Sequence, residues 1–162
     1  MEKTIDIDAV MKLAKTAEKI EYEAEKDVGT DSKSCVNIAI AKDEAFCFLY
    51  DDNIAFLEEN GCRIMYFSPI HDNEIPHDAD GVIFWGGYPE RYAKELSENK
   101  SMIKSVKKVI DSGIACIAEC GGFLYLHSYL EGTDGKKYPM AGIIDLSLIQ
   151  ISEPTRLDVI SY

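Results

Sequence analysis

From Cys35 onward, the sequence alternates short apolar runs with longer amphipathic segments. This alternation constrains the fold most strongly, because nearly continuous apolar runs are typical of parallel strands buried on both faces. The strands that we predict are Val36–Ala41, Arg63–Phe67, Gly81–Trp85 and Ile114–Ala118. The helices that we predict are Asp52–Asn60, Tyr88–Glu98, Ser101–Ser112 and Phe123–Leu130. Alternating strands and helices favour an α/β fold with three layers around a doubly wound, mostly parallel, flavodoxin-like sheet.

The amino-terminal segment has a different pattern. Apolar residues at roughly helical spacing predict a helix over Asp6–Glu25, with Asp8 as the residue that caps its start. The polar, glycine-bearing stretch Lys26–Ser34 is typical of a linker. We therefore expect residues 1–34 to be a helix and a linker that precede a compact domain.

Composition excludes several classes of function. Seventeen basic and 29 acidic residues give a net charge of −12, which disfavours a partner such as nucleic acid or an anionic membrane. The polar first residues and the absence of a long apolar run predict neither a signal peptide nor a membrane-spanning helix. Five cysteines, without a Cys-x-x-Cys pair, argue against a disulfide scaffold or a metal site and favour a cytoplasmic location.

The strongest candidate for a catalytic residue is Cys120. It follows a predicted strand almost directly and precedes a predicted helix, which is the arrangement of a nucleophile elbow. The neighbouring Ala118 and Gly122 are small enough for such a tight turn. A helix N-terminus favours a thiolate and offers backbone N–H groups to a developing oxyanion. We predict that the remaining cysteines are buried core residues: Cys35, Cys47, Cys62 and Cys116.

A second candidate segment is the pair Gly86–Gly87, which follows another predicted strand. Ligands bind at the carboxyl ends of parallel strands, and paired glycines allow the backbone to approach a substrate closely. Their N–H groups could complete an oxyanion hole with that of Gly121. The alternative is an ordinary turn that leads through Pro89 into the next helix.

These segments resemble one family, the cobyrinate a,c-diamide synthases. The sequence Ala-Glu-Cys-Gly-Gly-Phe-Leu-Tyr-Leu at Ala118–Leu126 strongly resembles the family's nucleophile motif. Gly86–Glu90 is similar to its oxyanion loop, usually Gly-Gly-Gly-Tyr-Pro-Glu, with Trp85 in place of the first glycine. Ala41–Tyr50 and Ser97–Lys100 match further patterns of the family.

The resemblance covers about Ile38 to Asp145 and implies a class I, triad-type glutamine amidotransferase domain. In this family the domain hydrolyses glutamine through a cysteine thioester. The ammonia passes to a synthetase domain, where ATP and magnesium activate the a and c carboxylates of a corrinoid. The resemblance implies Cys120 as the nucleophile and Gly86, Gly87 and Gly121 as oxyanion donors. It implies no cofactor or metal in this chain itself.

The histidine that such a cysteine needs as a base is not found in the sequence. The family's histidine comes downstream in a segment resembling Glu-Phe-His-Tyr-Ser, and no such segment occurs. On the predicted elbow helix, His127 would lie on the order of 10 Å from Cys120, as an ordinary surface histidine. His71 and His77 fall in a polar loop, where we expect them to be solvated.

The resemblance also predicts how the chain is divided. Residues 1–34 would be the tail of a missing synthetase domain, and residues 35–145 a partial amidotransferase domain. Residues 146–162 match no expected pattern and are interpreted as a foreign or frameshifted tail, so that the fragment would be inactive alone. No Gly-x-x-x-x-Gly-Lys-Ser/Thr phosphate loop for ATP is present.

Three alternatives stay open. The same domain could belong to a nickel-sirohydrochlorin a,c-diamide synthase, because the tetrapyrrole would be recognised elsewhere. The chain could instead be a folded, non-catalytic remnant that acts only by association. A different cysteine hydrolase with a similar elbow is the third alternative, against which the pairing of Gly-Gly-Tyr-Pro-Glu with Glu-Cys-Gly-Gly argues.

Overall fold

The computed structural model describes residues 6–18 and 35–148, with side chains up to Asp145. The chain divides into two units, Met1–Thr30 and Asp31–Tyr162. Parts of the predicted N-terminal helix (19–25), the predicted linker (26–34) and most of the predicted tail (149–162) lie outside the described residues. No helix in the described ranges has the length and apolar character that crossing a bilayer requires.

In the first unit, the described residues form helix α1 (Ile7–Ala14). Its cap is Asp6 rather than the predicted Asp8, which lies inside the first turn. Asp6 has an extended backbone, so that its carboxylate can accept a hydrogen bond from the Ala9 N–H at 2.9 Å. Asp8 is already helical and cannot take this geometry.

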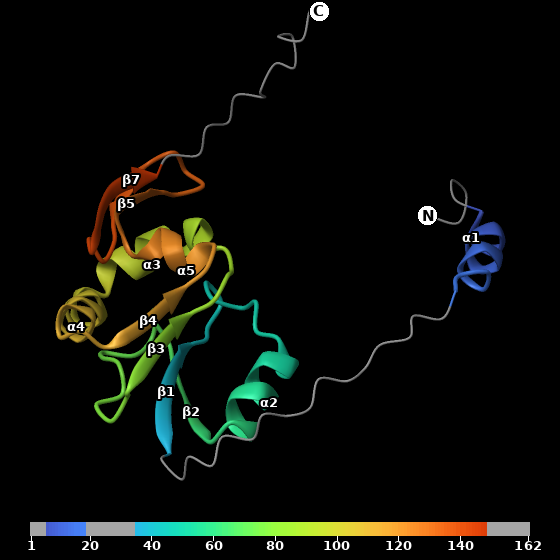
Figure 1. Cartoon of the computed structure of the whole chain (residues 1–162). Helices are drawn as coiled ribbons and strands as arrows, with labels where there is room; N and C mark the ends of the chain where they lie inside the picture. The colour runs from blue at the N-terminus through green and yellow to red at the C-terminus, as the bar shows by residue number, and fades with distance from the viewer. Residues whose placement is uncertain (1–5, 19–34, 149–162) are drawn as a thin grey trace, which may run out of the picture. The chain divides into compact units, whose positions relative to one another are not determined.

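The second unit is built on a parallel sheet of four strands (Figure 1). Its strands are β1 (Val36–Ala41), β2 (Cys62–Phe67), β3 (Gly81–Phe84) and β4 (Ala115–Ala118). They lie in the order β2-β1-β3-β4, and each neighbouring pair is parallel. The helical segments around the sheet are α2 (Asp51–Glu59), η1 (Pro89–Tyr92), α3 (Ala93–Glu98), α4 (Lys100–Asp111) and α5 (Gly121–Tyr125). The predicted strands and the α/β class are therefore confirmed.

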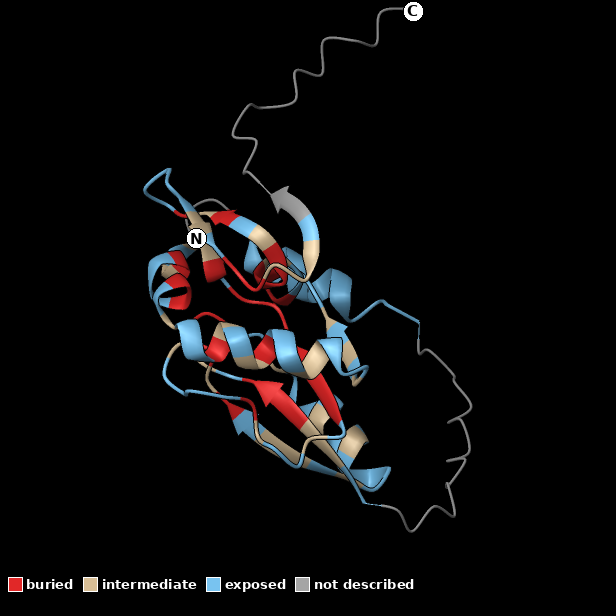
Figure 2. Cartoon of the chain, turned by 90° about the vertical axis from the view of Figure 1, so that its left-hand side faces the viewer, coloured by how far each residue is buried: buried red, intermediate tan, exposed pale blue. Residues whose placement is uncertain are grey.

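Alternate residues of the strands pack against different helices, which gives the domain its three layers. On one face, Phe84 and its neighbours pack with α3 and α4 through Leu96 and Met102. On the other face, Ile83 and Trp85 pack with the partly buried apolar side of α2. Figure 2 shows a buried strand in the middle of the sheet, and the helix in front of it alternates exposed residues with buried and half-buried ones. The central strand β3 and the end of β1 are thus buried on both faces, as their sequence predicts.

Strand β4 is less well covered than its neighbours. It pairs with β3, and no other strand of the described residues pairs with its outer edge. Ile117 of β4 is 55% exposed, whereas Ile83, its partner on the same face of β3, is 5% exposed. The layer that covers Ile83 therefore does not extend to Ile117.

A second, smaller sheet follows the elbow helix. It consists of β6 (Lys137–Pro139), β5 (His127–Glu131) and β7 (Ile144–Leu148), in that order. The predicted helix over Phe123–Leu130 is therefore wrong, because α5 ends at Tyr125 and a strand begins at His127.

The tight turn between β5 and β6 explains this difference. Gly135 has a φ of +75°, and the Asp134 carboxylate accepts hydrogen bonds from the Lys136 N–H and the Tyr138 hydroxyl. The turn lets residues after α5 pair with a returning strand, and that pairing overrides the local helical pattern. Strand β7 runs across the predicted domain boundary after Asp145.

The uneven cover of the sheet predicts different costs for one substitution at two positions. Ile83→Thr places a hydroxyl in the buried layer beside α2 and should lower the free energy of unfolding by about 1–3 kcal/mol. Ile117→Thr, on the open part of the same face, should change it by less than about 0.5 kcal/mol. Urea unfolding of both variants measures the difference, and equal costs would contradict this account of the open face.

Candidate active site

Cys120 lies at a strained turn between a strand and a helix. Its φ is +46° and its ψ is −111°, and among the described residues no other non-glycine residue has a positive φ. Strand β4 ends two residues earlier, and α5 begins at the next residue. Such a conformation costs about 1–3 kcal/mol for a residue with a Cβ and is found mainly at functional sites. The tight turn predicted from the sequence is therefore present.

The turn depends on close packing behind the cysteine. The Gly122 N–H donates to the carbonyl oxygens of Glu119 at 2.8 Å and Trp85 at 3.0 Å. A Cβ at Gly122 would overlap the carbonyl oxygen of Phe84, so that only glycine fits there. The Trp85 side chain is buried on the α2 face, which leaves its carbonyl free for this contact.

The structure brings the predicted site glycines together beside Cys120. A Cβ built on Gly86 would lie 3.6 Å from the Cβ of Cys120. A Cβ built on Gly121 would lie 2.9 Å from the backbone nitrogen of Gly87. The loops that follow β3 and β4 are therefore in direct contact at the carboxyl edge of the sheet.

The three glycines differ in the use of their backbone groups. Gly86 forms an antiparallel bridge with Phe48, whose N–H donates to the Gly86 carbonyl at 3.1 Å. The N–H groups of Gly87 and Gly121 donate to no protein acceptor within the described residues. Two backbone donors next to an exposed thiol can stabilise negative charge that develops on a bound carbonyl oxygen.

Two of the three histidines lie where the sequence predicts, in an exposed loop. The His71 Nε2 is 3.0 Å from a carboxylate oxygen of Glu44, and the two side chains are 60% and 54% exposed. A backbone hydrogen bond and, to a lesser extent, His71 hold the pKa of Glu44 below its usual value. The His77 Nε2 is 2.9 Å from a carboxylate oxygen of Glu74.

The prediction for His127 is wrong. This residue is not on a helix surface but is fully buried at the start of β5. Its Nδ1 donates to the carbonyl of Phe123 at 2.7 Å, and its Nε2 has no partner among the described residues. All three histidines of the chain are described, and no hydrogen bond joins any of them to the thiol of Cys120.

The other cysteines are not the buried core residues that we predicted. Cys35 and Cys47 are exposed, like Cys120, and Cys62 and Cys116 are half-buried. The first two lie in loops, and the strands of the others are the edges of the sheet, where burial on both faces is incomplete. Partial burial raises the pKa of the Cys116 thiol.

Comparison with known proteins identifies the family. The sequence model of the CobB/CobQ-like glutamine amidotransferase domain matches residues 37–159. The chain therefore belongs to this family of amidotransferase domains.

Among curated proteins, it resembles several cobyrinate a,c-diamide synthases. The protein of Fusobacterium nucleatum is 45% identical over 122 residues, which are 75% of this chain and 27% of that protein. The protein of Clostridium tetani is 45% identical over 134 residues, 83% of this chain and 29% of that protein. The protein of Caldanaerobacter subterraneus is 35% identical over 156 residues, 96% of this chain and 34% of that protein. The chain thus spans about a quarter to a third of the length of these relatives.

A solved structure supports the fold. A Listeria monocytogenes protein described as a peptidase E superposes with a TM-score of 0.56 at 13% sequence identity. The match covers 74% of this chain and 68% of that chain. At this identity the likeness shows a shared fold, which is consistent with the class I amidotransferase-like architecture predicted from the sequence.

The positive φ of Cys120 predicts an unusual order of stabilities. Because glycine adopts this conformation without strain, Cys120→Gly should be more stable than Cys120→Ala by about 1 kcal/mol. At Cys116, inside β4, the order should reverse, and glycine should cost about 0.5–1 kcal/mol relative to alanine. Urea unfolding of the four variants measures both differences. A Cys120→Gly variant that is less stable than Cys120→Ala would contradict the strain at the elbow.

Proposed function

We propose that this chain is the glutamine-hydrolysing domain of a cobyrinate a,c-diamide synthase, with Cys120 as its nucleophile. The observation that carries the proposal is the exposed thiol on a strained elbow, beside the free N–H groups of Gly87 and Gly121. Membership of the amidotransferase family supports glutamine as the substrate. Gly86 is the third proposed donor, and a Cβ built on it would lie 3.6 Å from the Cβ of Cys120.

In the proposed reaction, the sulfur of Cys120 attacks the side-chain carboxamide carbon of glutamine. Electrons move onto the carbonyl oxygen, which accepts hydrogen bonds from the backbone donors. The C–N bond then breaks, and ammonia leaves after receiving a proton, which gives a thioester. Water hydrolyses the thioester to glutamate and restores the thiol. A base must accept the thiol proton and, as its conjugate acid, then deliver a proton to the departing ammonia, and none of the three histidines is placed to do so in the described geometry.

The function of the whole protein is part of the proposal. By similarity to the longer relatives, the ammonia would amidate the a and c carboxylates of a corrinoid in cobalamin biosynthesis. By similarity to the longer relatives, ATP and magnesium would bind in a synthetase portion, since this sequence contains no Gly-x-x-x-x-Gly-Lys-Ser/Thr phosphate loop. A nickel-sirohydrochlorin a,c-diamide synthase is the alternative, since the tetrapyrrole substrate would be recognised by another part of the protein and not by this domain.

The proposal predicts which cysteine reacts first. Cys35, Cys47 and Cys120 are all exposed, so exposure alone predicts similar labelling by iodoacetamide at neutral pH. We expect Cys120 to be labelled fastest, because the elbow presents its thiol at the open carboxyl edge of the sheet, where a nucleophile acts. Cys116 should be among the slowest, since its pKa is raised. Mass spectrometry of peptides after partial labelling measures the order, and faster labelling of Cys47 would contradict the assignment.

The proposal also predicts weak turnover by the 162-residue chain itself. No basic side chain is hydrogen-bonded to the thiol of Cys120 in the described residues. The glutaminase rate should therefore be several orders of magnitude lower than that of a complete relative. The measurement is ammonia release from glutamine, with Cys120→Ser as the blank. Turnover near that of a complete relative would contradict the prediction and would direct attention to His71 and His77.

A further inference from the structure

We propose that Asp43 is a positioning residue that holds the Gly86–Tyr88 loop against Cys120. This inference rests on the proposed function and assigns a role to a residue of the Ala41–Tyr50 segment, for which the resemblance implied none. Asp43 lies in the loop after β1, and its side chain is half-buried. It has no hydrogen bond to Cys120, so it would act through the loops that it joins.

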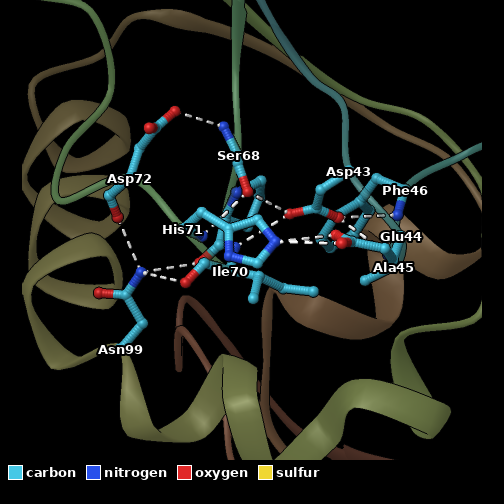
Figure 3. Close-up of polar contacts among 10 residues, drawn as sticks. Asp43, Glu44, Ala45, Phe46, Ser68, Ile70, His71, Asp72 and Asn99 are labelled. Atoms are coloured by element: carbon cyan, nitrogen blue, oxygen red, sulfur yellow. Dashed lines mark hydrogen bonds and ion pairs between the residues drawn. The ribbon is translucent and has the colours of Figure 1, made fainter.

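The carboxylate of Asp43 accepts hydrogen bonds on both of its oxygens (Figure 3). Oδ1 accepts from the N–H groups of Ala45 at 2.9 Å and Phe46 at 3.2 Å. Oδ2 accepts from the Ser68 hydroxyl at 2.8 Å and the Ile70 N–H at 2.9 Å. Four neutral donors thus satisfy this carboxylate, and such charge-assisted bonds are stronger than neutral ones.

The first pair of bonds fixes the segment that supports the site glycines. The Ala45 carbonyl accepts a hydrogen bond from the Tyr88 N–H at 2.9 Å, and the Phe48 N–H donates to the Gly86 carbonyl at 3.1 Å. A Cβ at Gly87 would overlap the Ala45 carbonyl oxygen. The position of the Gly86–Tyr88 loop therefore follows the position of residues 45–48, which Asp43 sets.

The second pair of bonds anchors Asp43 to the loop after β2. That loop is held in turn by Asn99, whose Nδ2 donates to the carbonyls of Pro69 at 2.9 Å and Asp72 at 2.7 Å (Figure 3). The Oδ1 of Asn99 accepts from the Met102 N–H at 3.2 Å and caps α4. Asp43 thus connects the site loop to a fixed point on a helix.

Among the described residues, no cation pairs with this carboxylate. The neighbouring Lys42 places its ammonium over the ring of Tyr66, 4.5 Å from the ring centre, and no salt bridge to Asp43 forms within the described residues. The hydroxyl of Tyr125 lies close enough that, after burial, the charge of Asp43 further raises its pKa. Asp43 therefore serves the backbone of the two loops rather than an ion pair.

Asp43→Asn tests the inference, because it keeps the shape of the side chain but turns one acceptor into a donor. The new NH₂ group must face two donors, either the amides of residues 45 and 46 or the Ser68 hydroxyl and Ile70 amide. The readout is alkylation of Cys120 in the full chain by a chloroketone analogue of glutamine. In this reaction the S–C bond forms, chloride leaves with the C–Cl electron pair, and the thiol proton passes to the buffer.

Iodoacetamide provides the reference rate, because it reacts with the thiol without occupying a glutamine-shaped site. We expect the wild-type chain to prefer the chloroketone, and Asp43→Asn to reduce that rate about tenfold as the backbone donors shift. Its iodoacetamide rate should stay within about twofold, since the thiol and the elbow are unchanged. Glu44→Gln is the matched control, an exposed neighbouring carboxylate that should leave both rates unchanged.

Ser68→Ala is a milder second variant, which removes one of the four bonds and should lower the chloroketone rate in the same direction. If Asp43→Asn fails to fold by circular dichroism, the decision rests on Ser68→Ala. Folded variants that keep the wild-type preference for the chloroketone would overturn the inference and leave the proposed function intact. Equal loss of both rates would show a merely structural role and would also overturn it. A wild-type chain with no preference would overturn the proposed function and this inference with it.

Discussion

The geometry of the site depends on the contact between Gly122 and the end of β3. The Gly122 N–H bonds to the Trp85 carbonyl, and the space where a Cβ would lie is filled by the Phe84 carbonyl. This contact holds the start of α5 against the neighbouring strand and keeps Cys120 in its strained conformation. The hydrogen bonds and packing around the turn offset a backbone cost that an isolated turn would relieve by rearranging.

The local sequence was sufficient to predict the parallel sheet and the elbow, because both follow from short-range features. Apolar runs such as Val36–Ala41 must be buried on both faces, and a strand that meets Cys120-Gly-Gly leaves little choice of turn. The error at His127 has a non-local cause. Its strand forms because Ile144 and the strand Lys137–Pro139 return to pair with β5, and a helical pattern in one segment contains no information about that partner.

The cysteines and Asp43 show a second limit on what can be predicted from the sequence alone. Whether Cys62 or Cys116 is buried depends on which strands lie at the edges of the sheet, and the order of strands is set by tertiary packing. The acceptor role of Asp43 toward Ala45 is a local Asx-type turn that the sequence could have indicated. Its bonds to Ser68 and Ile70 join residues far apart in the chain, so they could not have been predicted.

The site separates two requirements of cysteine catalysis. The proposed nucleophile and oxyanion donors are placed by backbone geometry, which one strand–turn–helix unit and its neighbouring loop can build on their own. The proton-transfer group must instead approach the exposed thiol as a side chain, and His71, His77 and His127 are each held by other partners. Gly86 lies beside the Cβ of Cys120 and the residue is exposed to solvent, so the solvent side is the open route by which a base can reach the sulfur. Alkylation by glutamine-shaped reagents and glutamine turnover therefore report different parts of the same site, and the first can persist where the second is lost.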